Sequence, residues 1–328
     1  MPELDVSVIT VSFNTCDILR DTLEAVQRHR GTLRIEQWVV DNASTDGSVR
    51  MIRHDFPDAQ LVVNQENLGP GRARNQVIPR CRGRYILNID SDVQVHADTM
   101  QALVAYMDEH PEVGAAGCKL LNPDGTYQRS VGHLHHLGPA LMRKIRTILA
   151  RRQREDYSAL TEPVNVGWLV GSICIYRQAT LEQVGAFDPR FFIYRDDLDL
   201  HTRFDRAGWK VAYLPGVAVT HLQGRTADRN FAAARFDYEY GWLLFSRKYG
   251  PLWWHWYRRG SLLARSFYLA RLCSDEGLSR RFWGKNPLLL RGIYAELLRS
   301  SLPVRRLAKS SAPPAGLRPS AGRETRTR

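Results

Sequence analysis

Residues 85–92 read Tyr-Ile-Leu-Asn-Ile-Asp-Ser-Asp, a short and largely apolar run that ends in two carboxylates, Asp90 and Asp92. An apolar run of this length that stops at acids predicts a buried strand. Open α/β sheets bind ligands beyond the carboxyl ends of their strands, so both carboxylates are expected to face a crevice. Such a pair suits Mg²⁺ or Mn²⁺, which proteins hold together with the phosphates of a substrate. By itself the pattern also fits a solvated turn, because two acids with one residue between them are common by chance.

The rest of the first 120 residues alternates between strand and helix patterns. Apolar runs at 6–11, 35–40 and 61–63 predict three more strands, and apolar residues at helical spacing between and after them predict helices. This alternation predicts an α/β fold with a Rossmann-like, mostly parallel central sheet flanked by helices. The chain has no Gly-x-Gly-x-x-Gly segment after its first strand and no Gly-Lys-Ser/Thr loop, which disfavours a dinucleotide-binding protein and a P-loop ATPase.

Composition places the chain among ordinary globular proteins, with 328 residues of which 44% are hydrophobic and 24% charged. Its five cysteines are widely spaced, which favours reduced thiols and a cytoplasmic protein. No signal-like segment opens the chain, and no apolar run approaches the roughly 20 residues that span a bilayer. We therefore expect a protein that is neither secreted nor integral to a membrane.

The net charge of +12 is unevenly distributed along the chain. Residues 1–250 carry 30 basic and 30 acidic side chains, whereas residues 251–300 carry nine and three and residues 301–328 carry seven and one. We expect a main folded domain over 1–250, a basic amphipathic helical extension over 251–300 and a disordered basic tail over 301–328.

Five segments in fixed order carry a resemblance to a known family. They read VSVITVSFNTCDIL from residue 6, VVDNASTDGS from 39, NLGPGRARNQ from 67, YILNIDSDV from 85, and GWLVGSICIYRQATLEQVGAFDPRFFIYRDDLDLHTRF from 167, with His221 following. Together they resemble a family 2 glycosyltransferase of the GT-A fold, and most closely its rhamnosyltransferase-like branch. The resemblance implies an inverting enzyme that moves a sugar from a nucleotide diphosphate donor to an acceptor hydroxyl. It also implies a nucleotide-binding half over 1–120 and an acceptor half over 121–250.

The resemblance assigns a metal and diphosphate site to Asp90, Asp92 and His221. A divalent ion held there neutralises the departing diphosphate, and Asp92 is the better candidate for direct coordination. His221 matches a histidine that completes the metal or diphosphate site in similar enzymes. A lone histidine at the end of a strand also fits a purely structural role.

The base that takes the acceptor proton is expected in the segment Arg-Asp-Asp-Leu-Asp over 195–199. The family usually has Glu-Asp-x-Asp here, so the first acid of this chain is one methylene shorter. Asp197 aligns with the base, and Asp196 is the second choice. The same acids also fit the first turn of a helix, where carboxylates complement the helix dipole. The acceptor-side residues are expected to be Trp168, Gly171 and Asp199.

Donor binding is expected at the first two strand ends and at the loop over 67–75. By resemblance, Asp41 accepts the N3 proton of a pyrimidine, which implies a uridine or thymidine donor. The glycines of the loop allow close backbone approach, and Arg72 or Arg74 is expected either to face phosphate or to be solvated. The complete expected nucleotide set is Thr10, Ser12, Asn14, Asp41, Asn42, Asn67, Gly69, Arg72, Asn75, Asp90 and Ser91.

The C-terminal extension has the composition of an interfacial helix. Three tryptophans within 253–256 are followed by apolar residues interleaved with arginines, which favours contact with an anionic membrane surface and suits a polyprenyl-diphosphate-linked or polysaccharide acceptor. A helical pair packed on the catalytic domain is the alternative. Nucleic-acid binding is disfavoured, because no RRM, KH or zinc-finger pattern is present and the charge of residues 1–250 is balanced. The expected donor is dTDP-rhamnose, with UDP-linked galactofuranose, glucose or N-acetylglucosamine as alternatives.

Overall fold

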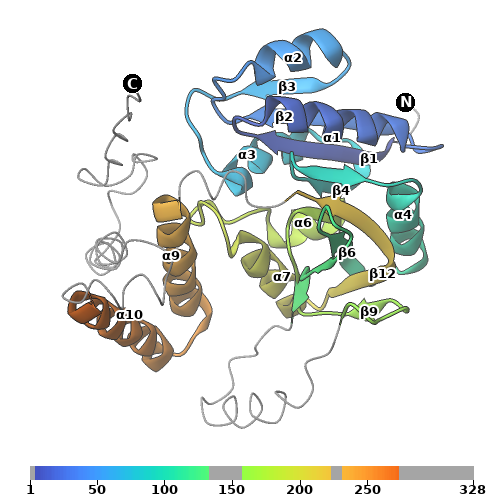
Figure 1. Ribbon diagram of the computed structural model, residues 1–328. Coiled ribbons are helices and arrows are strands. Elements are labelled where there is room, and N and C mark those ends of the chain that lie inside the picture. The colour runs from blue at the N-terminus through green and yellow to red at the C-terminus, as the bar shows by residue number, and fades with distance from the viewer. Residues whose placement is uncertain (1–3, 133–156, 223–230, 273–328) are drawn as a thin grey trace, which may run out of the picture. The chain divides into compact units, whose positions relative to one another are not determined.

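The computed structural model describes residues 4–132, 157–222 and 231–272 (Figure 1). The chain divides into two compact units, Met1–Asp228 and Arg229–Arg328. The helix at 231–249 therefore groups with the C-terminal extension, whereas the sequence analysis placed the domain boundary at 250. The part of the expected extension after 272 and the expected disordered tail at 301–328 lie outside the described residues.

The first unit contains strands and helices in alternation. In chain order they are β1 (Leu4–Ser12), α1 (Cys16–Arg28), β2 (Ile35–Asp41), α2 (Ser48–Asp55), β3 (Gln60–Val63), α3 (Pro70–Val77), a 3₁₀ turn (Ile78–Arg80), β4 (Gly83–Ile89), β5 (Val93–Val95), α4 (Thr99–Glu109), β6 (Val113–Leu121), β7 (Tyr127–Gln128), β8 (Val131–Gly132), β9 (Val164–Asn165), β10 (Trp168–Leu169), β11 (Ile173–Arg177), α6 (Gln178–Val184), α7 (Asp196–Arg206) and β12 (Lys210–His221). The second unit contains α9 (Phe231–Tyr249) and α10 (Leu252–Leu272).

The large sheet has the strand order β3-β2-β1-β4-β11-β6-β12-β5. Neighbours from β3 to β4 are parallel, as are β6 and β12, so the expectation of a mostly parallel sheet is confirmed. The exception in the middle is β11, which runs antiparallel to both β4 and β6. The carboxyl ends of β1, β2, β4 and β12 consequently meet at one edge of the sheet, and β11 begins at that same edge.

Helices cover both faces of this sheet (Figure 1). The residues of β4 alternate between the two sides, with Tyr85 and Leu87 in one hydrophobic cluster and Ile86 in the other. The first cluster includes apolar residues of α1 and α4, and the second includes residues of α3, α6 and α7. Burial on both faces explains why this strand reads as a nearly continuous apolar run.

Across residues 4–132, 157–222 and 231–272, no helix combines the length and the apolar character that crossing a bilayer requires.

Candidate active site

The two carboxylates that follow β4 lie beside a histidine from a distant part of the chain. Asp90 and Asp92 occupy the turn between β4 and β5, and β5 pairs with the end of β12 so that Val93 opposes His221. One ligand atom from each of Asp90, Asp92 and His221 lies within 4.8 Å of the other two. His221 Nε2 is 3.3 Å from Asp92 Oδ1. The turn therefore brings together the three residues expected to form a metal site.

Hydrogen bonds fix the imidazole of His221. Its Nδ1 lies 2.6 Å from Gln128 Oε1, and the Gln128 amide nitrogen donates to Asn122 Oδ1 at 3.0 Å. Because Gln128 presents its oxygen, Nδ1 carries the proton and Nε2 faces Asp92. Burial lowers the pKa of His221, but the hydrogen bond to Asp92 and the negative charges of Asp92 and Asp90 raise it by more.

This donor set fits a divalent cation. Two carboxylates and one imidazole nitrogen, with the second imidazole nitrogen held by a hydrogen bond, form the usual first and second layers of a protein metal site. Gln128 is a supporting residue that the sequence analysis missed, because it lies on the two-residue strand β7 and no local pattern marks it.

Arg74 forms ion pairs with the acids at this edge of the sheet, and its burial excludes the solvated alternative of the sequence analysis. The residue is 3% exposed, so it neither projects into solvent nor belongs to a solvated basic loop. Its Nη2 donates to Asp90 Oδ1 at 2.5 Å, and its Nη1 is 4.0 Å from Asp196 Oδ2. Burial raises the pKa of Asp90, and the charge of Arg74 opposes that rise. Arg74 thus compensates the charges of the half-buried Asp90 and the buried Asp196.

The acidic segment at 195–199 begins a helix, as its alternative interpretation predicted. Helix α7 starts at Asp196, directly after Tyr194 and Arg195, both of which have left-handed backbones with φ of 66° and 69°. Asp197 Oδ2 accepts a hydrogen bond from the Gly171 amide at 3.3 Å. Burial, followed by the negative charge of Asp196, raises the pKa of Asp197 to about 6. A carboxylate that titrates near neutrality is suited to take a proton from a hydroxyl.

Two consecutive residues directly before β11, Gly171 and Ser172, connect the two acidic groups. The carbonyl of Ser172 accepts a hydrogen bond from the Asp90 amide at 2.8 Å, and the amide of Gly171 donates to Asp197. Because β11 is antiparallel to β4, its first residues lie where β4 ends. The expected metal site and the expected base are therefore neighbours at the same edge of the sheet.

Polar atoms without partners mark the ends of β1 and β2. Asp41 is fully buried, and its Oδ2 accepts a hydrogen bond from the Ser44 amide at 2.9 Å. Its Oδ1 is also buried and has no partner among the described residues, and the same holds for Oγ1 of Thr10. A buried acceptor without a donor is costly, so a ligand that supplies one N–H would be favoured there. This is what the expected contact between Asp41 and a pyrimidine requires.

The other polar residues expected to bind the nucleotide near these strand ends have protein partners. Side-chain hydrogen bonds connect Ser12 to Thr15, Thr15 to Ser91 and Asn42 to Asn64. The Asn14 backbone amide donates to Ser44 Oγ, and Asn14 Oδ1 accepts from the Thr45 amide. These bonds tie the loops after β1, β2 and β4 to one another.

Residues 67–75, expected to form a loop, are mostly helical because α3 begins at Pro70, and they contact the segment that precedes α7. Asn75 donates to the Phe187 carbonyl at 2.7 Å and accepts from the Phe187 amide at 3.0 Å, while Arg72 Nε donates to the Pro189 carbonyl at 2.7 Å. Gly69 has φ of 79°, and a Cβ there would collide with the Phe192 carbonyl oxygen. Gly69 therefore allows its backbone to lie close to the segment that precedes α7.

Asn67, Trp168 and Asp199 all contact other parts of the protein. Asn67 Oδ1 accepts from the Gly69 amide at 2.9 Å, which shapes the start of α3. The indole of Trp168 lies against Gly132, where a side chain would not fit. Asp199, expected to face the acceptor, is fully buried and binds Arg203 Nε at 3.0 Å. This buried carboxylate therefore stabilises α7 through its ion pair with Arg203.

Comparisons with known proteins identify the family. The family model for Glycosyl transferase family 2 matches residues 7–185. The N-acetylglucosaminyl-diphospho-decaprenol L-rhamnosyltransferase of Mycobacterium tuberculosis (strain ATCC 25618 / H37Rv) is 30% identical over 257 residues, which make up 71% of this chain and 82% of that protein. The chain therefore belongs to glycosyl transferase family 2 and is a glycosyltransferase.

Solved structures confirm the GT-A fold. The mannosyltransferase PcManGT from Pyrobaculum calidifontis, in complex with GDP-Man and Mn²⁺, is similar with a TM-score of 0.51 and 19% identity, covering 91% of this chain and 86% of that one. TarS from S. aureus is similar with a TM-score of 0.50 and 14% identity, covering 86% of this chain and 46% of that one.

Proposed function

We propose that this glycosyltransferase inverts the configuration of the sugar it transfers, with Asp197 as the base. The observation that carries the proposal is the arrangement at one sheet edge of three groups: the Asp90, Asp92 and His221 cluster, the Asp197 carboxylate with a pKa of about 6, and the unpartnered oxygen of Asp41. A direct displacement needs one group for the leaving diphosphate, one for the acceptor proton and one for the nucleotide.

In this mechanism, the ionised Asp197 accepts the proton of the acceptor hydroxyl while the hydroxyl oxygen attacks the anomeric carbon. The bond to the donor diphosphate breaks on the opposite face of the sugar, which gives inversion. The Gly171 amide orients the carboxylate, and burial keeps its basicity near that of the working pH. Asp196 is left as the partner of Arg74, which makes it the weaker candidate for the base.

Asp90, Asp92 and His221 would hold Mg²⁺ or Mn²⁺. When bound, such an ion supplies Lewis-acid stabilisation to the departing diphosphate. The protein contributes the orientation of His221 through Gln128 and the charge balance of Asp90 through Arg74. The solved mannosyltransferase of the same fold contains Mn²⁺, which agrees with a divalent ion but does not choose between the two.

The proposed donor is dTDP-L-rhamnose and the proposed acceptor hydroxyl belongs to a polyprenyl-diphosphate-linked or polysaccharide glycan of a bacterial cell surface. The name of the 30% identical relative supports the sugar and the lipid-linked acceptor. The unpartnered oxygen of Asp41 supports a pyrimidine nucleotide. A UDP-linked galactofuranose, glucose or N-acetylglucosamine is the second candidate, because UDP and dTDP share the N3 proton.

The test is a donor screen on the purified full chain with a polyprenyl-diphosphate N-acetylglucosamine acceptor and either Mg²⁺ or Mn²⁺. We expect product only from dTDP-L-rhamnose, with the anomeric configuration opposite to that of the donor by NMR. Product from UDP-sugars alone would replace the donor assignment. A product of retained configuration would contradict the inverting mechanism.

We further propose that the enzyme associates with the cytoplasmic face of the membrane through residues 251–328. Of the five large apolar side chains exposed among the described residues, four lie on α10: Trp253, Trp256, Tyr257 and Leu263. Their spacing places them on one face of the helix, where interfacial proteins insert aromatic residues between headgroups. The sequence after residue 250 carries all of the excess positive charge, which complements anionic lipid.

Flotation with vesicles tests this association. The triple variant Trp253→Ser, Trp256→Ser and Tyr257→Ser should lose binding to vesicles that contain phosphatidylglycerol, whereas Val63→Ser, an exposed apolar residue of the first unit, should bind normally. Unchanged flotation of the triple variant, or a preference for RNA over vesicles, would contradict the proposal.

A further inference from the structure

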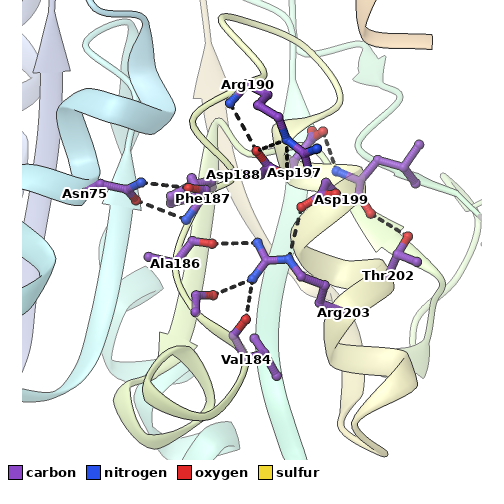
Figure 2. Close-up of polar contacts among 12 residues, drawn as sticks. Asn75, Val184, Ala186, Phe187, Asp188, Arg190, Asp197, Asp199, Thr202 and Arg203 are labelled. Carbon is purple, nitrogen blue, oxygen red and sulfur yellow. Dashed lines mark hydrogen bonds and ion pairs between the residues drawn. The ribbon is translucent and has the colours of Figure 1, made fainter. Parts of the chain in front are cut away.

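Arg203 on α7 binds three consecutive backbone carbonyls, that of the last residue of α6 and those of the first two residues of the loop that follows. Its Nη1 donates to the carbonyl oxygens of Val184 at 2.8 Å and Gly185 at 2.6 Å, and its Nη2 donates to that of Ala186 at 2.5 Å. Its Nε donates to Asp199, one helical turn earlier. Figure 2 shows Arg203 between its own helix and this loop. We call these contacts of Arg203 the Arg203 brace.

The backbone of Gly185 makes the brace possible. Gly185 directly follows the last residue of α6 and has φ of 80°, a left-handed conformation that favours glycine. A Cβ at this position would lie 3.7 Å from Arg203 Nη1, which is ordinary contact. The requirement for glycine is therefore conformational, and it serves the convergence of the carbonyls on Arg203.

The same loop is anchored from the opposite side by α3. Asn75 makes two hydrogen bonds to the backbone of Phe187, and Arg72 makes one to the carbonyl of Pro189 (Figure 2 for Asn75). The ring of Phe187 in turn lies 5.4 Å from the guanidinium carbon of Arg74, which binds Asp90. The loop is thus fixed between the helix that contacts the proposed metal site and the helix that carries the proposed base.

The chain needs such anchoring just before α7. Tyr194 and Arg195 both have positive φ, a conformation that is unfavourable for residues other than glycine and persists only where the surroundings impose it. These two residues lead directly into Asp196 and Asp197. A segment that relaxed to ordinary backbone angles would turn the first residues of α7 away from Gly171.

We propose that Arg203 is a positioning residue for glycosyl transfer, which fixes the 184–195 segment so that Asp197 stays in place relative to Asp90. The inference rests on the proposed role of Asp197. Loss of the brace displaces the base and leaves the nucleotide and metal contacts in place. Since displacements of about 1 Å at a reacting group can cost on the order of a hundredfold in rate, the main effect falls on kcat.

The test is Arg203→Lys in the full chain. Lysine keeps the charge next to Asp199, but its single ammonium has three donors and cannot reproduce the planar, four-bond arrangement of the guanidinium. We expect kcat to fall by about tenfold or more, with donor KM and Mn²⁺ affinity within about twofold of wild type. Hydrogen exchange, measured without substrate, should become faster in residues 184–199.

Arg177 offers a matched control. It lies at the far end of β11 and also binds backbone carbonyls, donating to those of Val113 at 3.2 Å, Met107 at 2.7 Å and His110 at 3.1 Å. Arg177→Lys should lower stability by a similar amount and leave kcat within about twofold of wild type. An equal loss of kcat in both variants would mean general destabilisation and would overturn the proposal.

Asn75→Ala provides a second and independent perturbation of the same loop. Asn75→Ala should lower kcat with little change in donor KM. A raised donor KM with normal kcat would instead mean that Asn75 binds the nucleotide and does not position the 184–195 segment. Wild-type kcat in Arg203→Lys, or unchanged exchange in residues 184–199, overturns the inference about Arg203. The exchange result does not depend on which residue is the base, so it separates a failure of this inference from a failure of the proposed function.

Discussion

The assignment of Asp197 as the base is tested by the pH dependence of the wild-type rate and by the substitution Asp197→Asn. The pH dependence of the wild type is the stronger test. With a pKa of about 6, Asp197 is about 90% ionised at pH 7 and about 10% ionised at pH 5. Since the base must be ionised to accept a proton, kcat/KM should be level above pH 7 and fall about tenfold for each pH unit below 6. A base with the ordinary aspartate value of 3.8 would lose almost nothing at pH 5.

The substitution itself should lower kcat by roughly 10²- to 10⁴-fold, the usual contribution of a general base, and remove the break near pH 6. Asp196→Asn should move the wild-type break to lower pH, because the negative charge of Asp196 raises the pKa of Asp197. Initial rates of transfer between pH 4.5 and 8 measure both effects, with circular dichroism at each pH to confirm that the protein stays folded.

Asp197→Asn should also stabilise the fold. Keeping an ionised Asp197 with its pKa raised from 3.8 to about 6 costs about 2 kcal/mol at neutral pH, after an allowance for its partial exposure to water. Because the folded-state pKa is the higher one, this cost is absent below pH 4, grows between pH 4 and 6 and is complete above pH 6. Asp197→Asn should therefore gain stability to urea at pH 7 but not at pH 3.5. Wild-type turnover in this variant, together with a level wild-type rate from pH 5 to 7, would refute the reasoning.

Three further predictions concern the nucleotide, the metal and the loop before α3. Asp41→Asn should weaken UDP and dTDP binding by about tenfold in calorimetry, because an amide presents a donor where the free carboxylate oxygen would accept one; equal affinity in both proteins would remove Asp41 from the nucleotide site. Chelation by EDTA should abolish transfer, and Asp92→Asn should weaken Mn²⁺ binding by at least tenfold in electron paramagnetic resonance titrations, whereas unchanged titration curves would refute the metal assignment. Gly69→Ala should cost about 2 kcal/mol in urea unfolding, because it combines positive φ with a collision at Phe192; Gly125→Ala, which has φ of 80° and open space around it, should cost about 1 kcal/mol.

Much of the fold follows from the sequence because its determinants are local. The strand before Asp90 is buried on both faces, so it reads as an apolar run, and the acids that end it mark the carboxyl edge of the sheet. The meeting of Asp92 with His221 follows from the same rule, since parallel strands bring their ends to a common edge.

The contacts that support the site could not be predicted, because they depend on the tertiary fold, and those between α3 and the segment before α7 join residues remote in sequence. Asn75 and Phe187 are 112 positions apart, and Arg72 and Pro189 are 117 apart. A helical arginine such as Arg74 or Arg203 has no local pattern that distinguishes it from a solvated one, and only the tertiary fold supplies the acids and carbonyls that bury it. The antiparallel direction of β11 is likewise a property of its pairing and not of its own residues.

That reversed strand accounts for how the two proposed chemical groups come to be adjacent. A parallel strand in the position of β11 would begin at the opposite edge of the sheet, and its first residues would be far from Asp90. With β11 reversed, the Ser172 carbonyl holds the backbone of Asp90 and the Gly171 amide holds the carboxylate of Asp197. The spacing between the proposed diphosphate site and the proposed base is therefore set by two consecutive residues of the turn that leads into β11. Arg74 provides a second connection between them, because it binds Asp90 and lies near Asp196. These two independent links restrict the distance between Asp90 and the start of α7. An in-line displacement with inversion requires such a fixed distance between the diphosphate site and the base.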